Sequence, residues 1–348
     1  MVDYLKDREP SFDALRGIAI IAVVAIHTIP WRYYQDYAVL SYRQLLNFAV
    51  PAFLFISGYW LSKKPVQSFN DYKYFLKKRL LRIFIPYLFW SLIFLTNEAV
   101  KLHNIDFLQS IFKLLTGGVS DHFYFVIVIA QLYILTPFLS CISRRAGGII
   151  LVAILNIMGL FVMYLLNSHK FHLVGETHLL THAPFYSWIL FYAIGLWMGN
   201  REEEIIVRPV MRSAVLPVIL IPLVISMLEA MFMVARYDNW KLAICALKYS
   251  SFLYSGGVII GFWIIRNHVE SWPGWLLALG ECSFGIYLMH KIPLRMIARI
   301  IPETGVIYHH QFLYQLIVVV TTLGICCVVI CVTRKLLPKV FYRGVLGF

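Results

Sequence analysis

Arg16 and His27 are the residues in this chain best placed for chemistry, because both lie inside its first apolar run. They are eleven residues apart, and at 100° per residue this spacing gives three full turns plus about 20°. Both side chains therefore project from one face of a helix, roughly 16 Å apart along its axis. Polar groups are costly inside a bilayer, so the shared face favours a polar cavity inside the protein. The alternative is that Arg16 reaches the membrane interface while His27 hydrogen-bonds to a neighbouring helix.

A second basic pair, Arg79 and Arg82, lies at the start of the third apolar run. The i, i+3 spacing places both side chains on one helix face. Lys77 and Lys78 just before them fit anchoring at a membrane interface, whereas Arg82 lies about one turn inside the apolar run. No acidic residue follows in that helix until Glu98. Arg82 therefore needs an anion from elsewhere, and a phosphate-bearing ligand that enters from the cytoplasm would supply one.

Composition places the chain in a membrane. Of its 348 residues, 60% are hydrophobic and 14% are charged, and the mean hydropathy is +0.73. A soluble domain usually has about a quarter of its residues charged. The apolar residues occur in blocks of about twenty, the length that crosses roughly 30 Å of hydrocarbon. We therefore predict an all-α polytopic membrane bundle that forms a single domain over residues 1–348.

The apolar blocks predict about ten transmembrane helices. If alternate loops are assigned to the two sides, starting with a cytoplasmic N-terminus, eighteen of the 31 Lys and Arg residues lie in inner segments and eight in outer loops. This excess predicts that both termini face the cytoplasm. The first run lacks a small-residue cleavage site, so we expect a retained span and not a signal peptide. The predicted spans are residues 14–31, 45–62, 80–97, 123–141, 147–167, 185–199, 213–234, 243–265, 274–297 and 312–333.

The net charge of +13 follows this alternation of loops. The basic residues are not gathered in one arm, and no aromatic-basic recognition motif occurs, so we expect no nucleic-acid partner. The six cysteines show no CxxC spacing, and thiols in apolar blocks act as small hydrophobes. We expect no disulfide. His178 and His182 have the i, i+4 spacing of some metal ligands, but only Glu176 lies near them, so we expect no metal.

The first run also carries a family resemblance. The stretch FDALRGIAIIAVVAIH (12–27) resembles the first-helix signature of the acyltransferase-3 family of integral membrane acyltransferases, a basic residue followed by a histidine. Further stretches resemble later helices of that family, and in this order they cover about residues 11–333 and support ten spans. In chain order they are VPAFLFISGYWLSKK (50–64), RLLRIFIPY (79–87) with its Arg-x-x-Arg motif, HFYFVIVIAQLYILTPFL (122–139), FYAIGLWMG (191–199) and SFGIYLMH (283–290).

The resemblance implies transfer of an acyl group, usually acetyl, from cytoplasmic acyl-coenzyme A (acyl-CoA) to a hydroxyl of a sugar or lipid-linked glycan. The family's histidine maps onto His27 and its basic partner onto Arg16. Its Arg-x-x-Arg motif maps onto Arg79 and Arg82, which would hold the phosphates of acyl-CoA. The chain stops soon after its last span, so the resemblance implies the stand-alone type without a C-terminal esterase-like domain.

Histidine suits this reaction, because the acceptor hydroxyl must lose its proton as it attacks the thioester. An imidazole with a pKa near 6.5 can take that proton, and a positioned general base contributes roughly 10²–10⁴-fold in rate. His27 could instead accept the acyl group first and act as a transient carrier. Arg16 lies too far along the helix for the reacting carbonyl, and its distance suits contact with the coenzyme A arm.

Three further residues, Ser57, Tyr133 and His290, are candidates for lining the cavity. Ser57 is followed by Gly58, and such small pairs more often let two helices pack closely. Tyr133 and His290 equally suit hydrogen bonds to neighbouring helices.

The alternative to an enzyme is a polytopic transporter or flippase for a lipid-linked saccharide. Transporters often contain interrupted helices in two related halves, and the sequence has no such repeat. A membrane-bound acyltransferase of the other large class would use His with Asn or Asp, and it would not predict the spacing of Arg16 and His27. The lack of an Asn-x-Ser/Thr sequon fits a bacterial inner membrane. The expected partners are acyl-CoA, a glycan or glycolipid acceptor and membrane lipids.

Overall fold

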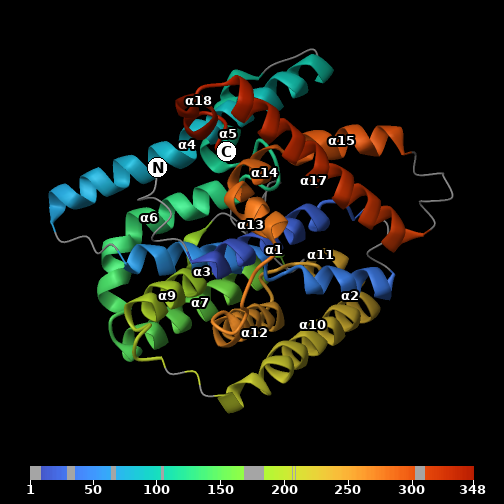
Figure 1. The fold of residues 1–348 in the computed structure, drawn as a ribbon. Helices are drawn as coiled ribbons and strands as arrows, with labels where there is room; N and C mark the ends of the chain where they lie inside the picture. Colours follow the sequence, from blue (N-terminus) through green and yellow to red (C-terminus); the bar gives the residue numbers. More distant parts are fainter. Residues whose placement is uncertain are drawn as a thin grey trace.

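The computed structural model describes residues 9–29, 36–63, 68–102, 106–167, 184–205, 207, 209–301 and 310–348. All regular structure in these ranges is helical (Figure 1), as the composition predicts. His178 and His182 lie outside the described residues.

Six helical stretches among the described residues are long and apolar enough to cross a membrane. Each coincides with a span predicted from the sequence, so the prediction of a polytopic helical membrane protein is confirmed. They are α2 with α3 (Tyr37–Leu45 and Ala49–Ser62), α4 (Phe69–Leu102), α6 (Tyr124–Ile142), α7 (Ala146–Asn167), α10 (Val215–Tyr237) and α17 (Gln311–Leu336).

Shorter helices occupy three other predicted spans. They are α1 (Pro10–Ile26), α9 (Ile189–Asn200) and α12 (Tyr249–Ile265), of 17, 12 and 17 residues. A perpendicular crossing of the hydrocarbon takes about twenty residues, so the count of ten spans stays a prediction. Other short helices are α5 (Phe107–Thr116), α11 (Trp240–Ala243), α18 (Lys339–Gly344) and the 3₁₀ turns at Phe185–Ser187 and Pro209–Arg212.

The prediction of one continuous helix over 274–297 is wrong. This segment forms α13 (Gly274–Glu281), α14 (Ser283–Met289) and α15 (Lys291–Ile300). Proline at 293 has no N–H to donate to the carbonyl four residues earlier, so the helical ladder is interrupted there. The backbone of Cys282 (φ −91°, ψ 2°) marks the other break. As a result His290 lies at a junction between two helices.

Helix α1 runs through the middle of the bundle (Figure 1), where it packs against α3, α13, α14 and α17. Phe12, Ile20 and Val24 are completely buried along its length. The helix that carries Arg16 and His27 is therefore surrounded by protein on most of its faces.

Helices α3 and α9 pack closely against each other, and this contact depends on two glycines. A Cβ atom on Gly58 would lie 2.1 Å from the carbonyl oxygen of Tyr192, and one on Gly195 would lie 2.1 Å from that of Phe55. Only glycine allows the two backbones to approach this closely. The close packing expected of the Ser57–Gly58 pair is thus made by Gly58, while Ser57 is half-buried.

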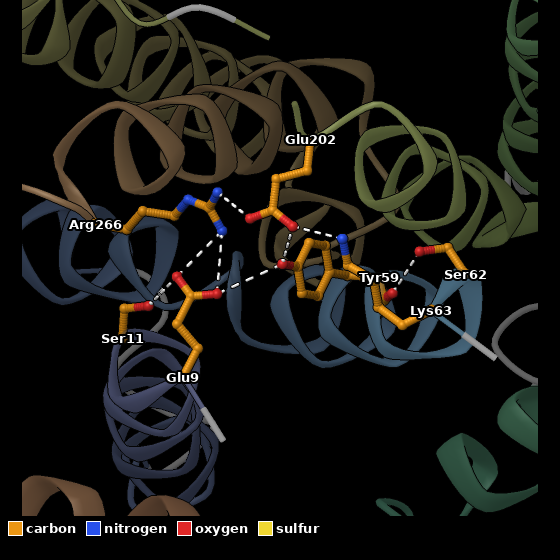
Figure 2. Close-up of polar contacts among 7 residues, drawn as sticks. All are labelled: Glu9, Ser11, Tyr59, Ser62, Lys63, Glu202 and Arg266. Carbon is orange, nitrogen blue, oxygen red and sulfur yellow. Dashed lines mark hydrogen bonds and ion pairs between the residues drawn. The ribbon is translucent and has the colours of Figure 1, made fainter. Parts of the chain in front are cut away.

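A partly buried ion-pair network ties the ends of α1, α3, α9 and α12 together (Figure 2). The Arg266 guanidinium donates to Glu9 at 3.2 Å and also to Glu202. Glu202 in turn accepts from the Tyr59 hydroxyl at 2.7 Å and from Lys63. We call these five residues the Arg266 cluster. The alternation of loops predicts that the N-terminus and the segments after α3, α9 and α12 lie on one side of the membrane. In the structure these segments meet at one end of the bundle.

Candidate active site

His27 lies directly after α1, at the end opposite the Arg266 cluster, in a group of three imidazoles. The centroid of its ring is 5.2 Å from that of His290 and 5.9 Å from that of His122. The rings of His122 and His290 are 4.8 Å apart. We call these three residues the histidine cluster. The structure thus joins two residues predicted from the sequence, His27 and His290, and adds His122, which lies just before α6.

Backbone and hydroxyl contacts fix the two inner rings. His290 Nδ1 lies 2.7 Å from the carbonyl oxygen of Tyr287, so Nδ1 carries the proton and Nε2 does not. His122 Nδ1 lies 3.0 Å from the Ser120 hydroxyl, and the Tyr287 hydroxyl donates to the backbone carbonyl of His122. The Nε2 atoms of both histidines are buried without a hydrogen-bond partner among the described residues. These atoms can therefore bond a group that enters the cluster.

Asp121 links the histidine cluster to a lysine. Its carboxylate lies 3.9 Å from His27 Nδ1 and 3.8 Å from His122 Nδ1, and it accepts from Lys291. Burial alone would raise the pKa of Asp121, but the nearby imidazoles of His122 and His27 and the bonded ammonium group of Lys291 outweigh burial and lower this pKa. Asp121 is therefore ionised at neutral pH. The Asp121 carboxylate lies beside Nδ1 of His27. The other ring nitrogen of His27, Nε2, therefore faces away from Asp121.

His122 is held in the neutral form by its surroundings. Burial lowers its pKa to about 4, although the nearby Asp121 carboxylate acts in the opposite direction. At neutral pH the ring therefore brings no positive charge to the cluster, and the cationic neighbour of Asp121 is Lys291.

A polar pocket of about 500 Å³ adjoins the histidine cluster. Asp121 and its partner Lys291 line the pocket, so a molecule in the pocket would lie beside the carboxylate that is near His27. Helix α4, the segment from α5 to α6 and helix α15 supply the walls. The residues are Phe94, Asn97, Glu98, Lys101, Lys113, Gly118, Val119, Ser120, Asp121, Lys291 and Arg295.

Arg16 lies about three turns of α1 away from His27. Its guanidinium donates to the Asp13 carboxylate at 2.8 Å, and Asp13 is buried one turn earlier on the same helix. The i, i+3 spacing of Asp13 and Arg16 permits this pair, so Arg16 has an anionic partner within its own helix. The Arg16 side chain is 29% exposed.

The Arg-x-x-Arg pair lies farther along α4. The Phe94 ring is 6.1 Å from the His122 ring, and Arg82 precedes Phe94 by twelve residues, or roughly 18 Å of helix. The Arg79 guanidinium lies 6.0 Å from the centre of the Tyr133 ring, so these two predicted residues are neighbours. Arg82 is exposed. The structure therefore places the basic pair with Tyr133 and apart from the histidine cluster.

Asp121, His122 and Lys291 were missed from the sequence. One feature of the sequence could have indicated them. Asp121 directly precedes His122, and Lys291 directly follows His290, so each pair places an imidazole beside a charged group at the end of an apolar run. Lys291 and Asp121 are 170 residues apart, so no local pattern joins them.

Three imidazoles beside a carboxylate are also the ligand types of metal sites. Among the described residues, however, no group of three or more His, Cys, Asp or Glu side chains is arranged to hold a metal ion. The arrangement can instead move protons, because it holds one partly exposed imidazole next to an ionised carboxylate.

The fold and site define a polytopic membrane protein that gathers three histidines and a carboxylate at one end of its central helix. The chain belongs to the acyltransferase-3 family, whose model, described as an acyltransferase domain, matches residues 9–331. It is similar to the "Putative membrane-bound acyltransferase YfiQ" of Bacillus subtilis (strain 168), with 24% identity over 298 residues that cover 79% of this chain and 78% of that protein. No solved structure matches the chain. The family inferred from the sequence motifs is confirmed, and the chain is a membrane acyltransferase.

Proposed function

We propose that this acyltransferase moves an acyl group, namely acetyl, from cytoplasmic acyl-CoA to a hydroxyl of a cell-surface or lipid-linked glycan. The observation that carries the proposal is the position of His27. Its Nδ1 atom lies 3.9 Å from the carboxylate of Asp121, and Asp121 lines the polar pocket. The family match favours this enzyme over the transporter alternative.

His27 acts as the general base in the proposed step. Its Nε2 takes the proton of the acceptor hydroxyl while that oxygen attacks the thioester carbonyl carbon. A C–O bond forms, the C–S bond breaks, and the imidazolium returns the proton to the coenzyme A thiolate. Asp121 lies beside Nδ1, where its negative charge stabilises the imidazolium during the step. The products are the ester and free coenzyme A, and the base is regenerated.

The donor reaches this site from the other end of the bundle in our proposal. The Arg266 cluster lies in the segments that alternate with the outer loops and carry the excess of basic residues, so we assign this end to the cytoplasm. Arg79 and Arg82 would bind the phosphates of acyl-CoA nearer that side. The extended pantetheine arm of coenzyme A is the part that would bridge the roughly 18 Å from Arg82 to the level of His122.

His27→Ala should lower acyl transfer by at least about 100-fold, because it removes the general base. The measurement is release of coenzyme A thiol, together with transfer of label from acetyl-CoA to glycan acceptors, by the purified protein in nanodiscs. His268→Ala is the matched control, since His268 is an exposed loop histidine. Full turnover in His27→Ala would refute this mechanism, whereas loss of turnover in both variants would point to general damage.

A further inference from the structure

The polar pocket has more positive than negative charge. Lys113 pairs with Glu98 at 2.7 Å, and Lys291 pairs with Asp121. Two of the lining cations have no carboxylate within ion-pair distance among the described residues. They are Lys101 and Arg295. Four cations against two carboxylates leave an excess of two positive charges in the lining.

This excess identifies the kind of ligand that fits. A phosphate monoester carries about −1.5 to −2 charges at pH 7 and three strong acceptor oxygens. A neutral sugar would leave both spare cations uncompensated, and a single carboxylate would compensate one. Arg295 is also held in place, because its guanidinium lies 5.3 Å from the centre of the Phe94 ring. Asn97 and Ser120 add uncharged hydrogen-bonding groups to the same wall.

We propose that the pocket binds the phosphate of a phosphate-bearing acceptor, either a soluble sugar phosphate or a sugar linked to a polyprenyl phosphate. The volume of about 500 Å³ leaves room for a sugar ring beyond the phosphate. Because Asp121 lines the pocket and contacts His27, a hydroxyl of that sugar would face the base. The role as acceptor rests on the proposed function, whereas phosphate binding does not require an acyl donor.

The test is binding of glucose 1-phosphate and of glucose to the full chain in phosphatidylcholine nanodiscs, by calorimetry and without acyl-CoA. Glucose 1-phosphate should bind at least about tenfold more tightly than glucose, because charge-assisted hydrogen bonds are added. The double variant Lys101→Gln/Arg295→Gln should lose about tenfold or more in affinity for the phosphate. Arg299→Gln is the matched control, since Arg299 is an exposed arginine on the same helix outside the pocket.

A second experiment shows whether the bound phosphate belongs to a soluble sugar phosphate or to a polyprenyl-linked sugar. Nanodiscs that contain polyprenyl phosphate should compete with glucose 1-phosphate if the acceptor is lipid-linked, and polyprenol should not. Binding without such competition assigns the pocket to a soluble sugar phosphate. Equal affinity for glucose and its phosphate, or unchanged affinity in the double variant, would overturn the proposal.

The two proposals fail in different ways. Acyl transfer that depends on His27, without selective phosphate binding, would refute the pocket assignment alone. Selective phosphate binding in a protein that transfers no acyl group from acyl-CoA would refute the proposed function alone.

Discussion

His27 differs from the other two members of the histidine cluster in its access to a ligand. Its side chain is 18% exposed, whereas those of His122 and His290 are 2% and 0% exposed. The inner rings are also fixed by bonds to Ser120 and to backbone carbonyls. His27 is therefore the imidazole that can meet a substrate, and the others shape the site around it.

Asp121→Asn should lower kcat by about 100-fold with a smaller change in KM, because the amide cannot stabilise the imidazolium of His27. Asp121→Glu keeps the charge and should recover part of the rate. The measurement is steady-state transfer from acetyl-CoA at saturating donor. Asp238→Asn is the control, since Asp238 is an exposed carboxylate whose φ of 48° suits asparagine. Equal rates for Asp121→Asn and the unaltered chain would exclude Asp121 as a positioning residue.

Arg82→Ala should raise the KM for acyl-CoA more than that for the acceptor. The reason is that the exposed guanidinium binds donor phosphates in our proposal and lies far from the pocket. The loss of a charge-assisted contact is expected to cost roughly tenfold in donor affinity. Initial rates with each substrate varied in turn give the two constants. Equal increases in both would assign Arg82 a structural role.

The sequence pointed to His27 and His290 as candidates but not to Asp121, His122 and Lys291 beside them. The spacing of Arg16 and His27 indicates that they share one face of one helix, and such a pattern can be recognised within a short stretch of sequence. The partners of His27 come from two segments that are distant in the sequence, one just before α6 and one at the junction of α14 and α15. Contacts of that kind depend on how helices pack, and the residue pattern within a single helix does not encode them.

Individual helices followed their apolar runs, with deviations at polar ends and at proline. Helix α4 begins at Phe69, eleven residues before the apolar run, because Ser68 and Asp71 form reciprocal N-terminal capping bonds of 3.1 Å. Those bonds stabilise a polar first turn that hydropathy overlooks. At the other extreme, Pro293 divides a run that hydropathy reads as continuous. Hydropathy thus predicts the apolar part of a helix, whereas capping residues and prolines determine where the helix begins and ends.

Gly58→Ala tests the contact between α3 and α9. The added methyl would lie 2.1 Å from the Tyr192 carbonyl, so the helices must separate, at a cost of about 1–3 kcal/mol in unfolding free energy. We expect a lower thermal midpoint for the purified protein in detergent. Gly256→Ala is the matched control, because a methyl there meets nothing within 4 Å and alanine favours helix. Unchanged stability in Gly58→Ala would show that this contact does not limit the stability of the bundle.

The whole molecule has two polar ends joined by α1. One end is closed by the Arg266 cluster, which draws on four helices, and the other carries the histidine cluster and the polar pocket. Arg79 and Arg82, to which we assign the donor phosphates in our proposal, lie on α4 apart from the histidine cluster. This arrangement suits an enzyme that takes its donor from one side of a membrane and its acceptor from the other.

Glu202 should make the stability of the whole bundle depend on pH in the acid range. Burial alone would raise its pKa, but the bonds from Lys63, Tyr59 and Arg266 lower this pKa from 4.5 to about 2. Because the folded pKa is lowered, the stabilisation is complete above about pH 4.5 and is lost as the pH falls toward about 2. The thermal midpoint of the unaltered chain should therefore decrease across this window.

Glu202→Gln should remove that part of the pH dependence and cost roughly 2 kcal/mol at pH 7, since the bonds to charged groups are weakened. Glu203→Gln is the control, because Glu203 is the exposed neighbour of Glu202 and should behave like the unaltered chain. The measurement is the thermal midpoint in detergent from pH 7 down to the lowest pH at which unfolding is reversible. An acid slope that is the same in Glu202→Gln and Glu203→Gln would mean that other carboxylates govern the acid stability. A lower midpoint with no acid slope in Glu202→Gln alone would show that Glu202 couples α1, α3, α9 and α12 at this end of the bundle.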